Sequence, residues 1–268
     1  MNNTVGFIGT GNMGAALAKA AAKKMAPEAI LLSNRTTAKA ERLAAALGCR
    51  SVSVETAARE SGYIFLGVKP QMMAGLLETI APVLKERDDE FVLVSMAAGL
   101  TIADIRRMAG AEHPVIRIMP NTPVEVGSGV ILYDASENVA EAVLTQFCEN
   151  LEYAGMLDRL EEKLIDAGSA VAGCGPAFAC LFAESLADGA VACGLPRKKA
   201  MEYAAQMLLG SAQLILESGQ HPGALKDAVC SPGGSTIAGI RALEQGSFRA
   251  DVMNAVAAAY ERTKELGK

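Results

Sequence analysis

The chain has 268 residues, 51% of them hydrophobic and 4% aromatic, with no Trp and a formal net charge of −5. So few aromatic rings and an acidic balance argue against a nucleic-acid platform and against a general binder of polyanions. We expect no apolar run of membrane-spanning length, and the N-terminus enters a strand at once, which predicts a cytoplasmic protein with no membrane association.

The first part of the chain alternates short β-branched runs with helical patterns. We expect strands at TVGFIG, AILLS, YIFLGV, FVLVSM and VIRIM, with helices between them, the first two over residues 13–25 and 36–47. This alternation is typical of βαβ units on a parallel sheet. Residues 127–133 and 153–157 are candidate strands at the edge of that sheet.

Near residue 160 the pattern changes, and only long helical segments follow. The expected helices cover residues 161–172, 176–193, 197–217, 235–244 and 248–266. Residues 182–192 and 201–216 are apolar on more than one face, which indicates either burial against a partner or a central place in the helical part. The sequence predicts an α/β, Rossmann-type dinucleotide-binding domain over residues 1–160, followed by an all-α domain over residues 161–268.

A glycine-rich turn follows the first strand. Gly9, Gly11 and Gly14 form GxGxxG at the start of a helix. Glycines at this place allow a tight turn and a close approach to a pyrophosphate, which the helix N-terminus attracts. A Gly-rich turn can also serve packing alone, but as the first loop of a βαβ series it predicts dinucleotide binding. The candidate cofactor contacts here are Ile8, Gly9, Thr10, Gly11, Asn12 and Met13.

The end of the second strand predicts which dinucleotide binds. The segment reads Ser33-Asn34-Arg35-Thr36 and carries no acid. A carboxylate there would bind the ribose 2′-hydroxyl, whereas an arginine beside polar side chains accommodates a 2′-phosphate. We therefore expect Ser33, Asn34 and Arg35 to favour NADPH, with NADH as the second cofactor. In the alternative interpretation, Thr36 caps the next helix and Arg35 is solvated. Thr36 can cap the helix even if Arg35 binds the phosphate.

Three more loops follow expected strands, where a doubly wound sheet binds its ligands. They are LGVKPQMM, SMAAGLT and RIMPNTP. A solvated lysine, a proline that stops a strand and a rigid turn are the structural alternatives for these positions. The candidate cofactor contacts are Val68, Lys69, Pro70, Gln71, Ala97, Ala98 and Gly99. The third loop, which contains Asn121, also lies at a strand end that faces the cleft.

The stretch SPGGST, residues 231–236, precedes a helical run. Alcohol dehydrogenation needs a positioned acid–base group, but His113 and His221 both stand next to a proline in expected turns. Reduction of an imine is less demanding, because the nitrogen can be protonated before hydride arrives. The amides of a helix start can hold an anion, and Ser235 and Thr236 add hydroxyl donors. This stretch therefore predicts a site for an anionic imine.

Motifs along the whole chain carry a family resemblance. They are FIGTGNMG at the start, VKPQ at 68–71, AAGLT at 97–101, MPNTP at 119–123, GCGPAF at 173–178 and LKDAVCSPGGSTIAGIRALE at 225–244. In this order and spacing they resemble the pyrroline-5-carboxylate reductase family, which makes L-proline. The resemblance implies that NADPH or NADH delivers hydride to the ring C=N carbon of 1-pyrroline-5-carboxylate.

The resemblance also implies site residues and an assembly. The substrate carboxylate is expected on amides of the loop Gly234–Thr236, with the Thr236 hydroxyl near the ring nitrogen as the catalytic group. The substrate-binding set is Gly175, Gly233, Gly234, Ser235, Thr236 and Asn121. The helical domain is expected to form an interleaved homodimer, and a larger ring of dimers stays open.

Two residues depart from the family pattern, and two other function classes remain. Cys174 and Phe178 stand where the family usually has Ser and Tyr, which removes two hydroxyls near the expected pocket. The six cysteines lack metal-site spacing, so we expect free thiols and no metal. A β-hydroxyacid dehydrogenase-like enzyme would need a lysine after Asp166, where none stands. Another cyclic-imine reductase and a non-catalytic NADP(H)-binding module are the remaining alternatives.

Overall fold

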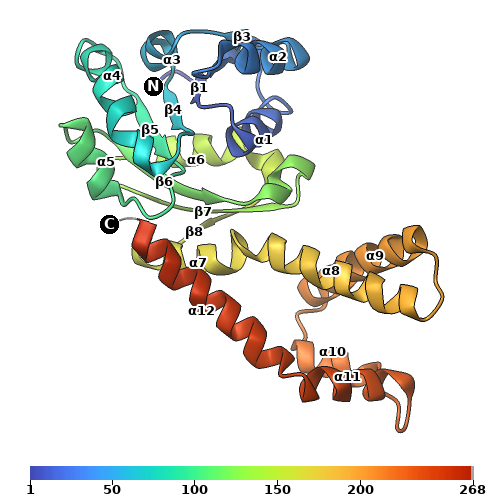
Figure 1. The fold of residues 1–268 in the computed structure, drawn as a ribbon. Coiled ribbons are helices and arrows are strands. Elements are labelled where there is room, and N and C mark those ends of the chain that lie inside the picture. Colours follow the sequence, from blue (N-terminus) through green and yellow to red (C-terminus); the bar gives the residue numbers. More distant parts are fainter. Residues whose placement is uncertain (267–268) are drawn as a thin grey trace. The chain divides into compact units, whose positions relative to one another are not determined.

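The computed structural model describes residues 1–266, which divide into two compact units (Figure 1). Among the described residues, unit 1 contains Met1–Cys174 together with residues 259–266, and unit 2 contains Gly175–Ala258. The predicted boundary lay at residues 160 and 161. The helix that follows this boundary packs on the sheet, so by its contacts it belongs to unit 1.

Unit 1 is built on one twisted sheet. The strands are β1 (Val5–Ile8), β2 (Ile30–Ser33), β3 (Arg50–Ser51), β4 (Tyr63–Leu66), β5 (Val92–Ser95), β6 (Val115–Pro120), β7 (Gly129–Ala135) and β8 (Gly155–Arg159). Their order is β3-β2-β1-β4-β5-β6-β7-β8. The first six are parallel, β7 runs antiparallel to β6, and β8 is parallel to β7. The predicted Rossmann-type fold is confirmed, including both edge strands.

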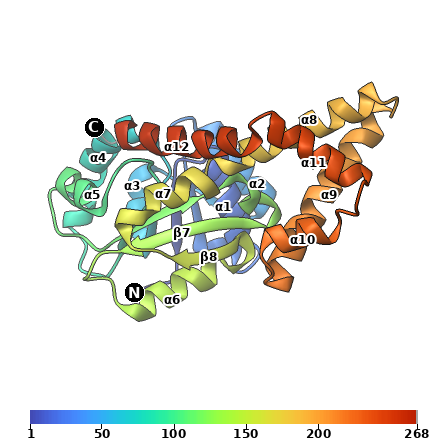
Figure 2. The ribbon, with the colours of Figure 1, turned by 90° about the horizontal axis from the view of Figure 1, so that it is seen from below.

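Helices cover both faces of the sheet. They are α1 (Asn12–Ala21), α2 (Thr37–Leu47), α3 (Val54–Glu60), α4 (Met73–Lys85), α5 (Ile102–Ala109), α6 (Glu141–Asn150) and α7 (Glu162–Ala172). One apolar core joins the sheet to α1, α2 and α6, and a second joins its other face to α3, α4 and α5. The strands β1, β2, β4 and β5 are buried on both faces, which explains their continuous apolar runs. Helix α7 lies along β7 (Figure 2).

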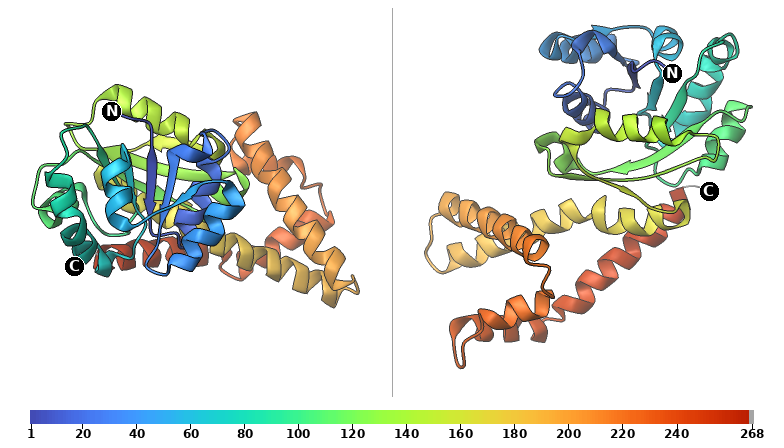
Figure 3. Two further views of the ribbon diagram at one scale, coloured as in Figure 1. Left: turned by 90° about the horizontal axis from the view of Figure 1, so that it is seen from above. Right: turned by 180° about the vertical axis from the view of Figure 1, so that it is seen from behind.

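Unit 2 is all helical, as predicted. Its helices are α8 (Gly175–Ala192), α9 (Arg197–Ser218), α10 (Pro222–Ala228), α11 (Ser235–Gln245) and the first part of α12 (Phe248–Leu266). Helix α9 packs along α8 (Figure 3). The sequence prediction missed α10, which has only seven residues, and β3, which has only two. Elements this short carry too few residues for a periodic pattern.

The helical stretch Glu162–Ala192 is long and apolar enough to cross a membrane by length and composition, and an apolar window of 18 residues within it has a mean hydropathy of 1.5. The expectation that no apolar run reaches this length was therefore wrong. Only 11% of the apolar window is buried within the single chain. The same composition suits a helix that a second protein surface covers.

Candidate functional site

The three glycines of the first loop differ in the physical reason for which glycine stands there. Gly9 has φ +105°, and a Cβ there would collide with the carbonyl oxygen of Gly67. A Cβ at Gly14 would collide in the same way with the carbonyl oxygen of Gly9. At Gly11 a Cβ would meet nothing within 4 Å. Packing therefore requires Gly9 and Gly14, while Gly11 keeps open space at the mouth of α1.

Polar groups at this open space lack partners. Gly11 is the N-cap of α1 and has no side chain to bond the first amides of the helix. The hydroxyl of Thr10 is buried without a hydrogen-bond partner among residues 1–266. Unbonded amides at a helix start attract an anion, and an unpaired buried hydroxyl is costly unless something bonds to it. The residues of this loop therefore fit the phosphates of a dinucleotide.

Asn34 joins the first loop to the loop after β2. Its Oδ1 accepts from the Thr10 amide at 3.2 Å, and its Nδ2 donates to the Thr36 carbonyl at 3.2 Å. The Ser33 carbonyl accepts from the Gly9 amide at 2.8 Å. Arg35 is exposed beside them. Thr36 does occupy the N-cap position of α2, but its side chain makes no capping bond. Arg35 makes no hydrogen bond or ion pair within residues 1–266, so its side chain is available to a ligand.

The other two cofactor loops lie at the same edge of the sheet. Strands β1, β4 and β5 are adjacent and parallel, with Ile8 paired to Leu66 and Leu66 to Ser95. The loops carrying Val68–Gln71 and Ala97–Gly99 thus follow strands that end together at the point where the strand order reverses. The prediction missed Gly67, whose amide bonds to the Ile8 carbonyl at 2.8 Å. A Gly directly after a buried strand was the available signal.

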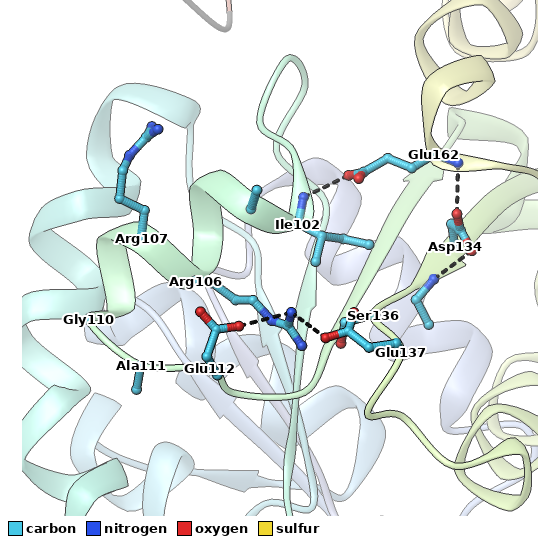
Figure 4. Close-up of a pocket in the computed structure, with 12 residues that line it drawn as sticks. Ile102, Arg106, Arg107, Gly110, Ala111, Glu112, Asp134, Ser136, Glu137 and Glu162 are labelled. Carbon is cyan, nitrogen blue, oxygen red and sulfur yellow. Dashed lines mark hydrogen bonds and ion pairs between the residues drawn. The ribbon is translucent and has the colours of Figure 1, made fainter.

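The loop after β5 is held firmly at its far end. Gly99 has φ +77°, and Thr101 and Asp104 form a reciprocal capping box at the start of α5. Burial raises the pKa of the Asp104 carboxyl, but hydrogen bonds from Thr101 and the charge of Arg107 outweigh it and lower that pKa below its ordinary value. The Ile102 amide donates to Glu162 at 2.7 Å (Figure 4). The loop is therefore anchored on α7 as well as on α5.

Glu162 belongs to a buried ion-pair network that the sequence prediction missed. Arg117, in the middle of β6, is 1% exposed and bonds to Asp166 and, at 3.4 Å, to Glu162. Both acids lie on α7, four residues apart and therefore on one face of the helix. The Arg117 Nε has no partner among the described residues. An arginine inside the apolar run VIRIM was the signal for a buried charge that must be paired.

A cavity of about 650 Å³ lies beside α5 and β7 (Figure 4). It contains none of the predicted site residues. Its most prominent charge, Arg106, is already paired with Glu112 at 3.0 Å and Glu137 at 2.9 Å. Because Arg106 is already bonded to these two carboxylates, we assign no ligand to this cavity.

Asn121 follows β6, and its side chain is used inside unit 1. The Val130 amide donates to Oδ1 at 2.8 Å, and Nδ2 donates to the Ala172 carbonyl at 3.0 Å. These bonds connect β7 with the C-terminal end of α7. A direct substrate contact stays a prediction, because the groups that would make it already have main-chain partners.

The predicted substrate loop belongs to unit 2. Gly233 has φ +68°, and Gly234 is the N-cap of α11. Ser235 and Thr236 are the first two residues of the helix, both are exposed, and neither hydroxyl makes a hydrogen bond among the described residues. Neither hydroxyl therefore caps α11. Gly175 begins α8 in the same unit.

Two family models match the chain. Residues 4–99 match one described as NADP oxidoreductase, coenzyme F420-dependent, and residues 162–266 match one described as pyrroline-5-carboxylate reductase dimerisation. The first covers the dinucleotide loops described above, and the second runs from α7 to the end of α12.

Named relatives match over the full length. The chain is 37% identical to a pyrroline-5-carboxylate reductase of Pisum sativum, covering 98% of this chain and 96% of the relative. The protein of that name in Escherichia coli is 36% identical over 100% of both chains. The crystal structure of the Plasmodium falciparum pyrroline carboxylate reductase with NADP bound superposes with a TM-score of 0.89 at 33% identity, covering 100% and 99% of the two chains.

Proposed function

The chain belongs to the pyrroline-5-carboxylate reductase family, and we propose how its own residues perform the reaction of that family. It is an NAD(P)H-dependent oxidoreductase that reduces 1-pyrroline-5-carboxylate to L-proline. The observation that carries this function is the full-length match, which includes both the dinucleotide loops and the helical segment. The relatives and models named above give no support to the hydroxyacid dehydrogenase or to a non-catalytic module.

The residues of the first unit are suited to hold the cofactor. The free amides of α1 and the Thr10 hydroxyl would hold the pyrophosphate, and Arg35 would pair with the 2′-phosphate. When bound, the reduced nicotinamide supplies a hydride for the ring C=N carbon. The open space at Gly11 allows the main chain to approach the phosphates closely.

The start of α11 is suited to hold the substrate. Its first amides have no helical partners, so they can bind the carboxylate of 1-pyrroline-5-carboxylate. The nitrogen takes up one proton from solvent before hydride arrives, and hydride then converts the C=N bond to CH–NH while the Thr236 hydroxyl bonds to the ring nitrogen. No further acid on the chain is needed for this step.

Turnover itself is the direct test of this function. Purified protein is mixed with NADPH and 1-pyrroline-5-carboxylate while the nicotinamide absorbance is followed, and L-proline is identified as the product. The absorbance should fall only when both compounds are present. NADPH binding without turnover would make the protein a binding module instead.

Arg35→Ala should raise the KM for NADPH and leave the KM for NADH nearly unchanged. The side chain is exposed at the end of β2, where only the 2′-phosphate distinguishes the two cofactors. A charge-assisted contact of this kind contributes roughly 1.5–3 kcal/mol. Steady-state kinetics with each cofactor measures the effect. Arg42→Ala, which removes another exposed arginine from the same region, is the control, and an equal loss with both cofactors would reject the assignment.

Cys174→Ser should retain most of the activity. The thiol is half-buried in the turn after α7, and hydride transfer needs no nucleophile. Serine also restores the residue that the family usually has at this place. The kcat and the KM for 1-pyrroline-5-carboxylate are compared with those of Cys193→Ser, an exposed thiol. A loss of orders of magnitude in a folded Cys174→Ser protein would show that the thiol acts in the reaction.

The apolar surface of unit 2 supports a homodimer. An open groove of about 420 Å³ between α8, α11 and α12 is lined by apolar side chains, among them Phe178, Phe182 and Phe248. Leu181, Leu216 and Met253 are more than half exposed in the single chain. The family model that matches residues 162–266 is described as dimerisation, so we propose a second copy of the chain as the surface that covers the apolar stretch Glu162–Ala192. Sedimentation of the purified protein measures the assembly and also distinguishes a dimer from a ring of dimers.

We also propose that the protein is cytoplasmic. All six cysteines are free thiols in the structure. Free thiols are usual in a reducing compartment, where disulfides are rare.

A further inference from the structure

The main chain between α7 and α8 is interrupted in a specific way. Helix α7 ends at Ala172, and α8 begins at Gly175. The amides of Gly173 and Cys174 both donate to the Ser169 carbonyl, at 2.8 and 3.0 Å. The second bond spans five residues, which is the spacing of a π-type turn. This turn opens GCGPAF, the segment that contains the proposed substrate contact Gly175.

Pro176 leaves a carbonyl without its helical donor. In a continuous helix the Ala172 carbonyl would accept from the amide four residues later, which is residue 176. Proline has no N–H, so this bond cannot form. A carbonyl that is partly shielded from water needs another donor, and the structure supplies one from elsewhere in unit 1.

The donor is the side chain of Asn121. Its Nδ2 reaches the Ala172 carbonyl at 3.0 Å, and its Oδ1 accepts from the Val130 amide at 2.8 Å. Asn121 is 7% exposed, so solvent does not compete strongly for either bond. One amide group thus replaces the bond that Pro176 removes and ties the end of α7 to β7.

We propose that Asn121 is a positioning residue for substrate binding: it fixes the end of α7, from which the segment 173–178 departs. This inference rests on the proposed function, because that function assigns the substrate contact to Gly175. In this role Asn121 does not touch the substrate, because its side-chain amide acts through the main chain of Ala172.

Asn121→Asp removes the donor while it keeps the shape and the acceptor for the Val130 amide. At a pH where the new carboxyl is ionised, an oxygen faces the Ala172 carbonyl and the two repel. The KM for 1-pyrroline-5-carboxylate should rise by about tenfold, and misplacement of this kind can cost up to about a hundredfold. The KM for NADPH should not change. Hydrogen exchange at the amides of residues 173 and 174 should become roughly two- to tenfold faster, as expected for one lost hydrogen bond.

Asn150→Asp is the matched control. Asn150 is 2% exposed on α6 and also bonds through both ends of its amide, to Asn3 and Gln146. It should lower the melting temperature without raising the KM for either compound. Equal kinetic changes in both variants, or an unchanged KM for 1-pyrroline-5-carboxylate in Asn121→Asp, would overturn the proposal. Unchanged exchange at residues 173 and 174 would overturn it whatever the kinetics. A wild-type protein without turnover would instead refute the proposed function, and the exchange experiment would still decide whether Asn121 anchors α7.

Discussion

Thr236→Val should lower kcat by about two to three orders of magnitude, the upper range for loss of one donor to a developing charge. Valine keeps the shape of the side chain and removes only the hydroxyl that we place at the ring nitrogen. NADPH affinity should not change, because the cofactor loops lie in unit 1. Steady-state kinetics on 1-pyrroline-5-carboxylate and a thermal melt of the same preparation measure the two effects separately.

The structure makes this prediction sharper, because the capping position of α11 is Gly234. Loss of a capping side chain costs about 1 kcal/mol, and Thr236→Val removes none. The melting temperature should therefore stay the same. Ser235→Ala is the control at the neighbouring helix position and should reduce kcat much less, since we assign the anion contacts there to main-chain amides. A Thr236→Val protein that turns over normally would show that its hydroxyl has no part in the reaction.

Arg117→Met should lower the free energy of unfolding by about 3–5 kcal/mol, the range for breaking a buried ion pair by removing one partner. The substitution leaves Asp166 and Glu162 on α7 without their counter-charge, and the arginine has no access to water. Denaturant titration measures the shift of the midpoint, with an unchanged slope showing that the folded state remains compact.

Arg59→Met serves as the control for this stability prediction. Arg59 pairs with Glu86 at 3.7 Å, and both side chains are more than half exposed. Exposed ion pairs contribute about 0–1 kcal/mol. If the two variants lose the same stability, the network around Arg117 does not hold α7 on the sheet.

Local sequence rules were sufficient to place the glycine-rich turn after β1 and the break between α7 and α8. Glycines at fixed spacing after a strand are typical of a phosphate loop, and Pro176 lacks the N–H that a continuous helix would need at that position. Gly11 and Arg35 are both exposed. Such rules apply to them because the place of each residue depends only on the loop that contains it. The substrate contacts rest on the family motif and stay predictions.

Interactions between distant segments could not be predicted in the same way. The bond from Asn121 to Ala172 spans 51 residues, and the pair of Arg117 with Asp166 spans 49. Both need the antiparallel pairing of β6 and β7, which places α7 beside β6. No motif in either segment predicts the pairing of β6 with β7. The sequence shows that Asn121 is polar and follows a strand, but its partner depends on the fold.

The return of α12 to unit 1 has a consequence for synthesis on the ribosome. Residues 259–266 belong to a unit whose other residues end at Cys174, so the whole of Gly175–Ala258 is translated in between. Domains usually fold as they emerge, but this one acquires its last segment only after the intervening helices have been made. A nascent chain stalled after residue 174 should therefore hold an incomplete first unit, more open to proteolysis than the same residues in the released protein.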